Sequence, residues 1–139
     1  MGKDYENLDH TGDLGVKVWG DSREELLQNA SKALVDTIVE LGRVTPKREV
    51  EWAIEADSPE ELLVQQLQEI LFRMDAEGMV FSDFRISLRG LSSVKCLAYG
   101  ERLDREKHEF KTEIKAVTYH QLKMGQEDDK WVAQIIFDV

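Results

Sequence analysis

The sequence has few of the residues and segments that define several large classes of protein. Only two of its 139 residues are proline and only one is cysteine. A single cysteine excludes an intramolecular disulfide. No apolar leader follows Met1, and no stretch reaches about 18 uninterrupted apolar residues, which predicts neither export nor membrane insertion. We therefore expect a cytoplasmic protein with one free thiol, Cys96, inside its core.

The signatures of several common enzyme chemistries are also missing. The sequence has no Gly-rich phosphate loop, no GxSxG elbow, no HExxH and no paired CxxC, which disfavours nucleotide hydrolysis and zinc chemistry. Its 28 acidic and 18 basic side chains give a net charge of −10. Because binding to nucleic acid needs a basic surface, strong direct contact with RNA or DNA is not expected, and a cation or a basic protein is the better partner.

What the sequence does contain is a single domain, residues 1–139, with two well-marked helices. The length suits one hydrophobic core, and no repeat or linker divides the chain. One helix follows a capping box at residues 22–25, with Gly42 placed as its left-handed cap. The other follows a capping box at residues 58–61, has Pro59 at its first position and ends before Gly78.

The remaining ordered segments alternate apolar and polar residues, as strands do. A polar stretch at residues 125–130 separates the last two strands as a hairpin loop. Since the final strands follow one another without a helix, they can only be antiparallel neighbours. The pattern predicts an α+β fold, a two-layer sandwich with both helices packed on one face of a mixed, mostly antiparallel sheet. The strands are expected at residues 16–20, 50–56, 84–88, 94–99, 114–124 and 131–137.

Oxygen-bearing residues gather near the two ends of the chain. The segment HTGDLG at residues 10–15 carries Asp13 in a glycine-containing turn, and the segment IIFDV at residues 135–139 ends in Asp138 and the carboxylate of Val139. Hard divalent cations bind carboxylate and carbonyl oxygens. If the last strand pairs within the sheet, these groups would form part of a metal site.

The segment EIKAVTYHQLKM at residues 113–124 is a third candidate. Read as one strand, it places Thr118 and His120 on the same face. A histidine in such a position is more often a hydrogen-bonded structural residue than a ligand.

Together, HTGDLG, EIKAVTYHQLKM and IIFDV resemble the archease family over essentially the whole chain. The resemblance implies a mixed α/β sandwich and a non-catalytic accessory protein that activates the GTP-dependent tRNA-splicing RNA ligase, promoting its guanylylation and multiple turnover. It also implies a divalent cation, calcium before magnesium or manganese, bound by Asp13, Asp138 and Val139. His10, Thr118 and His120 would support these ligands. The family more often has HTADIG as its first motif, so Gly12 here is expected to loosen the loop.

Two other functions remain open on sequence grounds. A stand-alone metal-dependent hydrolase or phosphoesterase would use Asp13 and Asp138 for the metal and a histidine as general base, and would turn over without a partner. A chaperone-like scaffold would instead need an exposed apolar patch, to which Trp19, Trp52 and Trp131 would contribute.

Overall fold

The structure is a computed structural model that describes residues 4–10 and 13–139. None of the helices in these ranges is long and apolar enough to cross a membrane. In chain order the elements are β1 (Tyr5–His10), β2 (Asp13–Gly20), α1 (Arg23–Ile38), the 3₁₀ turn η1 (Leu41–Arg43), β3 (Arg48–Glu55), α2 (Pro59–Glu77), β4 (Met79–Arg89), β5 (Ser93–Arg102), β6 (Ala116–Val117), β7 (Lys123–Glu127) and β8 (Lys130–Asp138).

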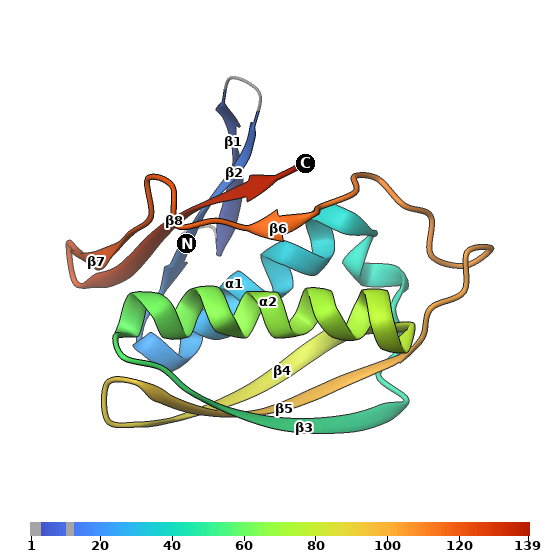
Figure 1. Cartoon of the computed structure of the whole chain (residues 1–139), viewed down its shortest axis with the longest axis horizontal. Coiled ribbons are helices and arrows are strands. Elements are labelled where there is room, and N and C mark those ends of the chain that lie inside the picture. The colour runs from blue at the N-terminus through green and yellow to red at the C-terminus, as the bar shows by residue number, and fades with distance from the viewer. Residues whose placement is uncertain (1–3, 11–12) are drawn as a thin grey trace.

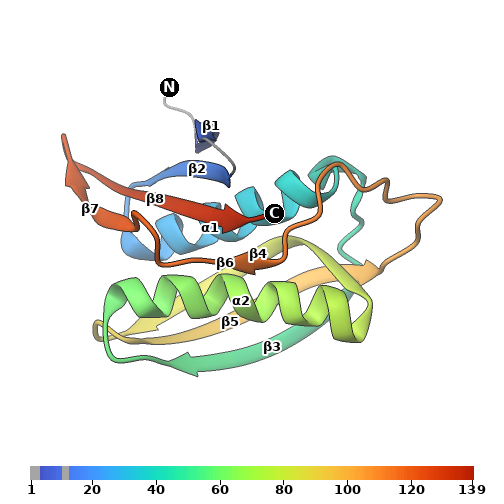
Figure 2. The same ribbon diagram turned by 45° about the horizontal axis from the view of Figure 1, so that its top comes forward.

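The strands form two sheets with the helices between them. One sheet has the order β1-β2-β8-β6, with β7 also paired to β8, and the other has the order β3-β5-β4. Every strand pair in the described chain is antiparallel. Figures 1 and 2 show α1 and α2 lying between the two sheets. The predicted α+β class is confirmed, but the strands occupy two layers where the sequence suggested one.

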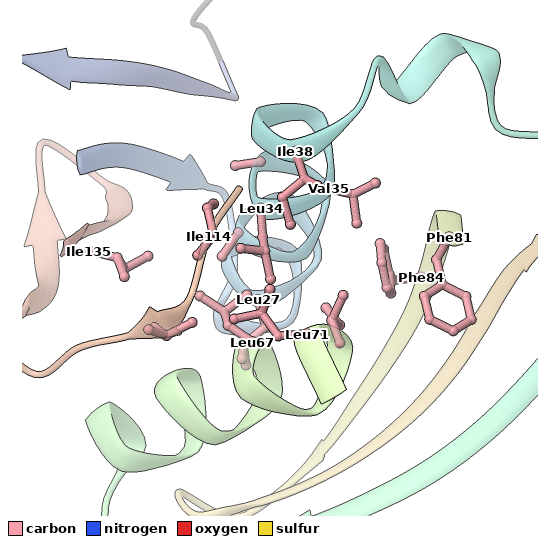
Figure 3. Close-up of a cluster of buried hydrophobic side chains, with 14 of the residues drawn as sticks. Leu27, Leu34, Val35, Ile38, Leu67, Leu71, Phe81, Phe84, Ile114 and Ile135 are labelled. Atoms are coloured by element: carbon pink, nitrogen blue, oxygen red, sulfur yellow. The ribbon is translucent and has the colours of Figure 1, made fainter. Parts of the chain in front are cut away.

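The core explains why a second sheet is present. Helix α1 buries residues beyond a single stripe, including Ala33 and Val35, and it contacts both β2 and β4. A helix that is apolar on more than one face needs a layer on each side. Figure 3 shows Phe81 and Phe84 approaching the helices from one sheet and Ile135 from the other.

The helix starts agree with the sequence, and one of the two predicted ends does not. The hydroxyl groups of Ser22 and Ser58 accept hydrogen bonds from the backbone N–H groups of Glu25 and Glu61, both at 3.1 Å. Gly78 takes the left-handed conformation after α2, with φ +65°. The predicted cap at Gly42 is wrong, because α1 ends at Ile38 and Gly42 lies inside η1.

The predicted strand at residues 114–124 is also wrong. Only β6 and β7 are extended, and the intervening residues 118–122 lie opposite just two residues of β8. The extra residues leave the sheet as a short loop, within which Gln121 has a φ of +51°. The hairpin after it is tighter than expected, because its turn is limited to Asp128 and Asp129, which both have positive φ values.

Cys96 lies inside the core, as the sequence indicated. It is fully buried, and the amide of Gln66 donates to its sulfur at 3.5 Å. The side-chain amide oxygen of Gln66, Oε1, accepts a hydrogen bond from Trp52 Nε1 at 2.9 Å. Burial raises the pKa of the Cys96 thiol to about 11, so the group is protonated at neutral pH.

Candidate functional site

The pairing of β2 with β8 brings the two terminal motifs together. Leu14 lies opposite Phe137 in this antiparallel pair. Asp13 begins β2 and Asp138 ends β8, so each is the next residue outward along its strand. Residues that face one another on neighbouring antiparallel strands have Cβ atoms about 4.5 to 5.5 Å apart. The two aspartates therefore start from adjacent backbone positions, although 124 residues separate them in the sequence.

The strand that carries Asp138 is held on both of its sides. Phe137 is fully buried, and Asp138 pairs with Ala116 of β6 on the side away from β2. The carbonyl oxygen of Asp138 also accepts a hydrogen bond from the backbone N–H of Lys115 at 2.8 Å. These contacts fix the backbone position from which the Asp138 carboxylate extends into solvent.

The donor atoms at this position fit a hard cation. Asp138 is exposed and Asp13 is half-buried, and two like charges on facing strands are unfavourable unless an opposite charge offsets them. Carboxylate oxygens are the ligands that calcium and magnesium prefer. Val139, which follows directly, is 42% exposed, so a carboxylate there would be accessible to the same ion.

The described side chains alone do not complete a coordination shell. Among the side chains of residues 4–8 and 13–139, no group of three or more His, Cys, Asp or Glu is arranged to hold a metal ion. Calcium takes six to eight oxygen ligands. Asp13 and Asp138 would therefore need the Val139 carboxylate, backbone carbonyls or water to complete the site.

The three residues predicted to support the ligands, His10, Thr118 and His120, lie in different surroundings in the structure. The backbone of His10 pairs with Asp13 across β1 and β2, while its side chain, like residues Thr11 and Gly12, lies outside the described part of the chain. Thr118 donates from Oγ1 to the carbonyl of Ile136 at 2.9 Å and accepts from the backbone N–H of His120. The prediction that Thr118 and His120 share a strand face is wrong, because both lie in the loop after β6. Thr118 holds that loop to β8, and His120 is exposed.

A buried ionic cluster at the end of β5 was not found from the sequence. The Glu101 side chain is 8% exposed, and its carboxylate accepts hydrogen bonds from Lys107 Nζ at 2.7 Å, the Thr45 backbone N–H at 2.8 Å and His108 Nε2 at 2.8 Å. Lys47 approaches the other oxygen at 3.6 Å. The cluster joins the start of β3 to the segment after β5.

The hydrogen bonds of this cluster define its protonation state. The Asp104 backbone N–H donates to His108 Nδ1, so that nitrogen carries a lone pair and Nε2 carries the proton given to Glu101. Burial by itself would raise the pKa of the Glu101 carboxyl. The hydrogen bonds from Lys107, Thr45 and His108 outweigh it and lower this pKa to about 2. Glu101 is thus a carboxylate at pH 7.

Taken together, the fold and the paired strand ends define a class of α+β protein in which helices separate two antiparallel sheets and acidic residues from both ends of the chain lie on neighbouring strands. The chain belongs to the archease protein family, whose profile matches residues 5–139. The family resemblance drawn from the three sequence motifs is therefore confirmed.

Relatives of known name and structure agree over nearly the full length. The protein archease of Methanopyrus kandleri is 43% identical over 97% of this chain and 99% of its own, and that of Pyrococcus furiosus is 38% identical over 99% of both. The solution structure of protein 1598 from Methanobacterium thermoautotrophicum superposes with a TM-score of 0.80 at 31% identity, covering 98% of this chain and 99% of that one. An archease from Thermotoga maritima, described as a possible chaperone, gives a TM-score of 0.67 at 26% identity over 96% of both chains.

Proposed function

We propose that this protein is a non-catalytic accessory protein of the GTP-dependent tRNA-splicing RNA ligase and promotes guanylylation and multiple turnover of that enzyme. A divalent cation, with calcium the first choice, would be held by Asp13, Asp138 and the Val139 carboxylate. Membership of the archease family supports the role. The observation that carries the site is the register of β2 and β8, which sets the two aspartates on facing strand ends.

The protein itself would contribute the negative charge of Asp138, carried at the end of a strand whose backbone is held in place. β8 is paired on both sides, so Asp138 can meet a partner without first ordering its backbone. A bound cation would offset the repulsion between the two carboxylates. The acidic molecule, with a net charge of −10, suits docking on a basic surface of the ligase.

The proposal is tested by measuring guanylylation and multiple-turnover ligation by the cognate ligase with and without this protein. We expect Asp138→Ala to lower both rates to the level of the ligase alone, because the substitution removes one of the two facing carboxylates. Asp138 is exposed, so in EDTA the variant should keep the melting temperature of the wild type.

The matched control is Asp57→Ala. Asp57 is an exposed aspartate between β3 and α2, and its loss should leave stimulation unchanged. A folded Asp138→Ala protein that stimulates the ligase as well as the wild type does would remove the paired carboxylates from the mechanism.

The description of the Thermotoga maritima neighbour raises a chaperone-like role as a second candidate. Such a role would need a continuous apolar surface. Trp52 is buried, while Trp19 and Trp131 are partly buried. Five large apolar side chains in the described chain are exposed: Phe72, Leu91, Phe110, Tyr119 and Val139. They lie on separate segments of the chain and are not the continuous apolar surface that a chaperone-like role needs, so the accessory role is favoured.

A further inference from the structure

A strongly basic hollow lies at the end of the three-stranded sheet, far along the chain from the paired aspartates. It has a volume of about 540 Å³ and is formed by the start of β3, the end of β5 and the segment that follows β5. Figure 1 shows this segment, in orange, extending beyond the sheets. Five cationic side chains line the hollow: Lys47, Arg48, Arg102, Arg105 and Lys107.

The local charge is opposite to that of the whole molecule. Two carboxylates, Glu101 and Asp104, also line the hollow, so five positive and two negative groups leave a net charge of +3. The complete chain carries −10. Solubility does not require such a local excess, and a concave surface of one sign concentrates ions of the other sign.

Sheet pairing brings two of the arginines together. Arg48 lies opposite Gly100 in the pair of β3 and β5, and Arg102 is two residues further along β5. Such diagonal neighbours are about 7 to 8 Å apart, which is within reach of long side chains. The backbone N–H of Lys47 donates to the Gly100 carbonyl at 2.9 Å, which extends the pairing to the edge of the hollow.

The two carboxylates of the hollow, Glu101 and Asp104, already accept hydrogen bonds from other groups of the protein. Glu101 binds Lys107 at 2.7 Å and Lys47 at 3.6 Å, and so fixes these two lysines at the wall of the hollow. Asp104 accepts a hydrogen bond from the backbone N–H of Glu106 at 3.0 Å. These bonds keep Lys47 and Lys107 in place and do not neutralise the arginines.

Two of the arginines have no anionic partner among the side chains that the structure describes. Within residues 4–8 and 13–139, neither Arg48 nor Arg102 forms an ion pair or a side-chain hydrogen bond. Arg105 lies over the ring of Phe110, with 5.3 Å from the guanidinium carbon to the ring centroid. Cations that line one hollow without anionic partners repel one another, and a bound anion would relieve this repulsion.

We infer that this hollow is a binding site for phosphate groups. Guanidinium groups bind phosphate oxygens through paired, charge-assisted hydrogen bonds, and lysines add point charges. The net charge of the molecule opposes a long polyanion, so the site fits the phosphates of one nucleotide or of a short length of RNA strand. The inference is independent of the ligase role proposed above and uses none of its residues.

The test is a titration of the ¹⁵N-labelled protein with pyrophosphate, ATP and a single-stranded RNA octamer, followed by NMR. We expect amide shifts confined to residues 45–48 and 100–108, and an affinity that falls as salt concentration rises. Tighter binding of ATP than of the octamer would identify a nucleotide, and the reverse order would identify an RNA strand. Absence of localised shifts with all three ligands would overturn the inference.

Substitution of the two unpaired arginines tests whether they contribute to phosphate binding. The double variant R48A/R102A should raise the Kd for pyrophosphate about tenfold or more, since each arginine would lose charge-assisted hydrogen bonds. Both side chains are exposed, so the fold should be retained. Arg89→Ala is the matched control, because Arg89 is an exposed arginine at the opposite end of β4, and it should bind as the wild type does.

Two results would contradict the site. Equal affinity of R48A/R102A and the wild type for pyrophosphate would show that the two arginines bind no phosphate. Binding of a hexaglutamate peptide as tight as that of pyrophosphate, with the same shifts, would show a general anion surface without phosphate preference.

Discussion

Glu101 has an unusual environment for a carboxylate. It is the one acidic side chain classed as buried in the part of the chain that the structure describes, and it accepts hydrogen bonds from three groups on two segments. Its folded pKa of about 2 lies below the ordinary value of 4.5. A group with a lowered folded pKa stabilises the protein above its unfolded pKa, and this contribution disappears as the pH falls through the folded pKa.

We therefore predict that the free energy of unfolding falls between about pH 4.5 and pH 2, and that Glu101→Gln removes part of this pH dependence. At pH 7 the substitution should cost about 1 to 3 kcal/mol, because Lys107 loses its charged partner inside the cluster. Urea unfolding measured at several pH values checks both statements.

Glu55→Gln serves as the control, since Glu55 is exposed at the far end of β3. A Glu101→Gln profile parallel to that of the wild type across this pH range would contradict the assignment.

The sequence indicated some of the residues with structural or candidate functional roles and gave no sign of others. Asp13 and Asp138 could be proposed as ligands because each lies at the end of an apolar strand segment, where an acidic residue interrupts the pattern. Glu101 and His108 could not be found, because neither lies in a periodic pattern and their contact depends on the path of the chain after β5. Nothing local to Lys107 or His108 indicates that they fold back onto the preceding strand.

At the level of elements, helix starts were predictable because their signal is local. A serine that caps a helix satisfies backbone N–H groups only a few residues away, so the motif carries the whole interaction. Helix ends are less certain. Gly42 was a plausible cap, but Val39 already has an extended backbone and forms an isolated bridge with Phe110, which ends α1 sooner.

Helix α2 allows a direct test of its cap. Ser58→Ala should lower the free energy of unfolding by about 1 kcal/mol, because the Glu61 N–H loses its acceptor. Ser58→Asp should keep most of the stability, since aspartate also caps helices well. Chemical unfolding of the three proteins at one pH compares them, and equal stability of Ser58→Ala and the wild type would show that the cap contributes nothing.

The segment at residues 114–124 shows what alternation cannot predict. Alternating residues fit a long strand, but β8 offers only Ile135 and Ile136 opposite residues 118–122. The surplus length must leave the sheet. This mismatch is a property of the partner strand, so the segment alone does not reveal it.

At the level of the whole molecule, the fold class followed from the sequence and the number of sheets did not. Alternation tells which residues face inward, but not which of two layers they belong to. The decisive feature is that α1 is apolar on more than one face, as Val35 shows.

Cation binding by the paired aspartates would be linked to global stability. A ligand that binds only the folded state stabilises it, by about 2.7 kcal/mol at a concentration one hundred times its Kd. We predict that calcium raises the melting temperature of the wild type relative to EDTA, and that Asp138→Asn abolishes the difference. Scanning calorimetry in calcium and in EDTA measures it. Equal melting temperatures of the wild type under both conditions would contradict the cation part of the proposed function.

The enclosed thiol has one more consequence. Cys96 lies on β5, the central strand of its sheet, and is both protonated and shielded from water. An alkylating reagent needs a thiolate that it can reach, so it can modify Cys96 only after β5 and the helix above it separate. The rate of alkylation of the native protein therefore reports how often the whole core opens.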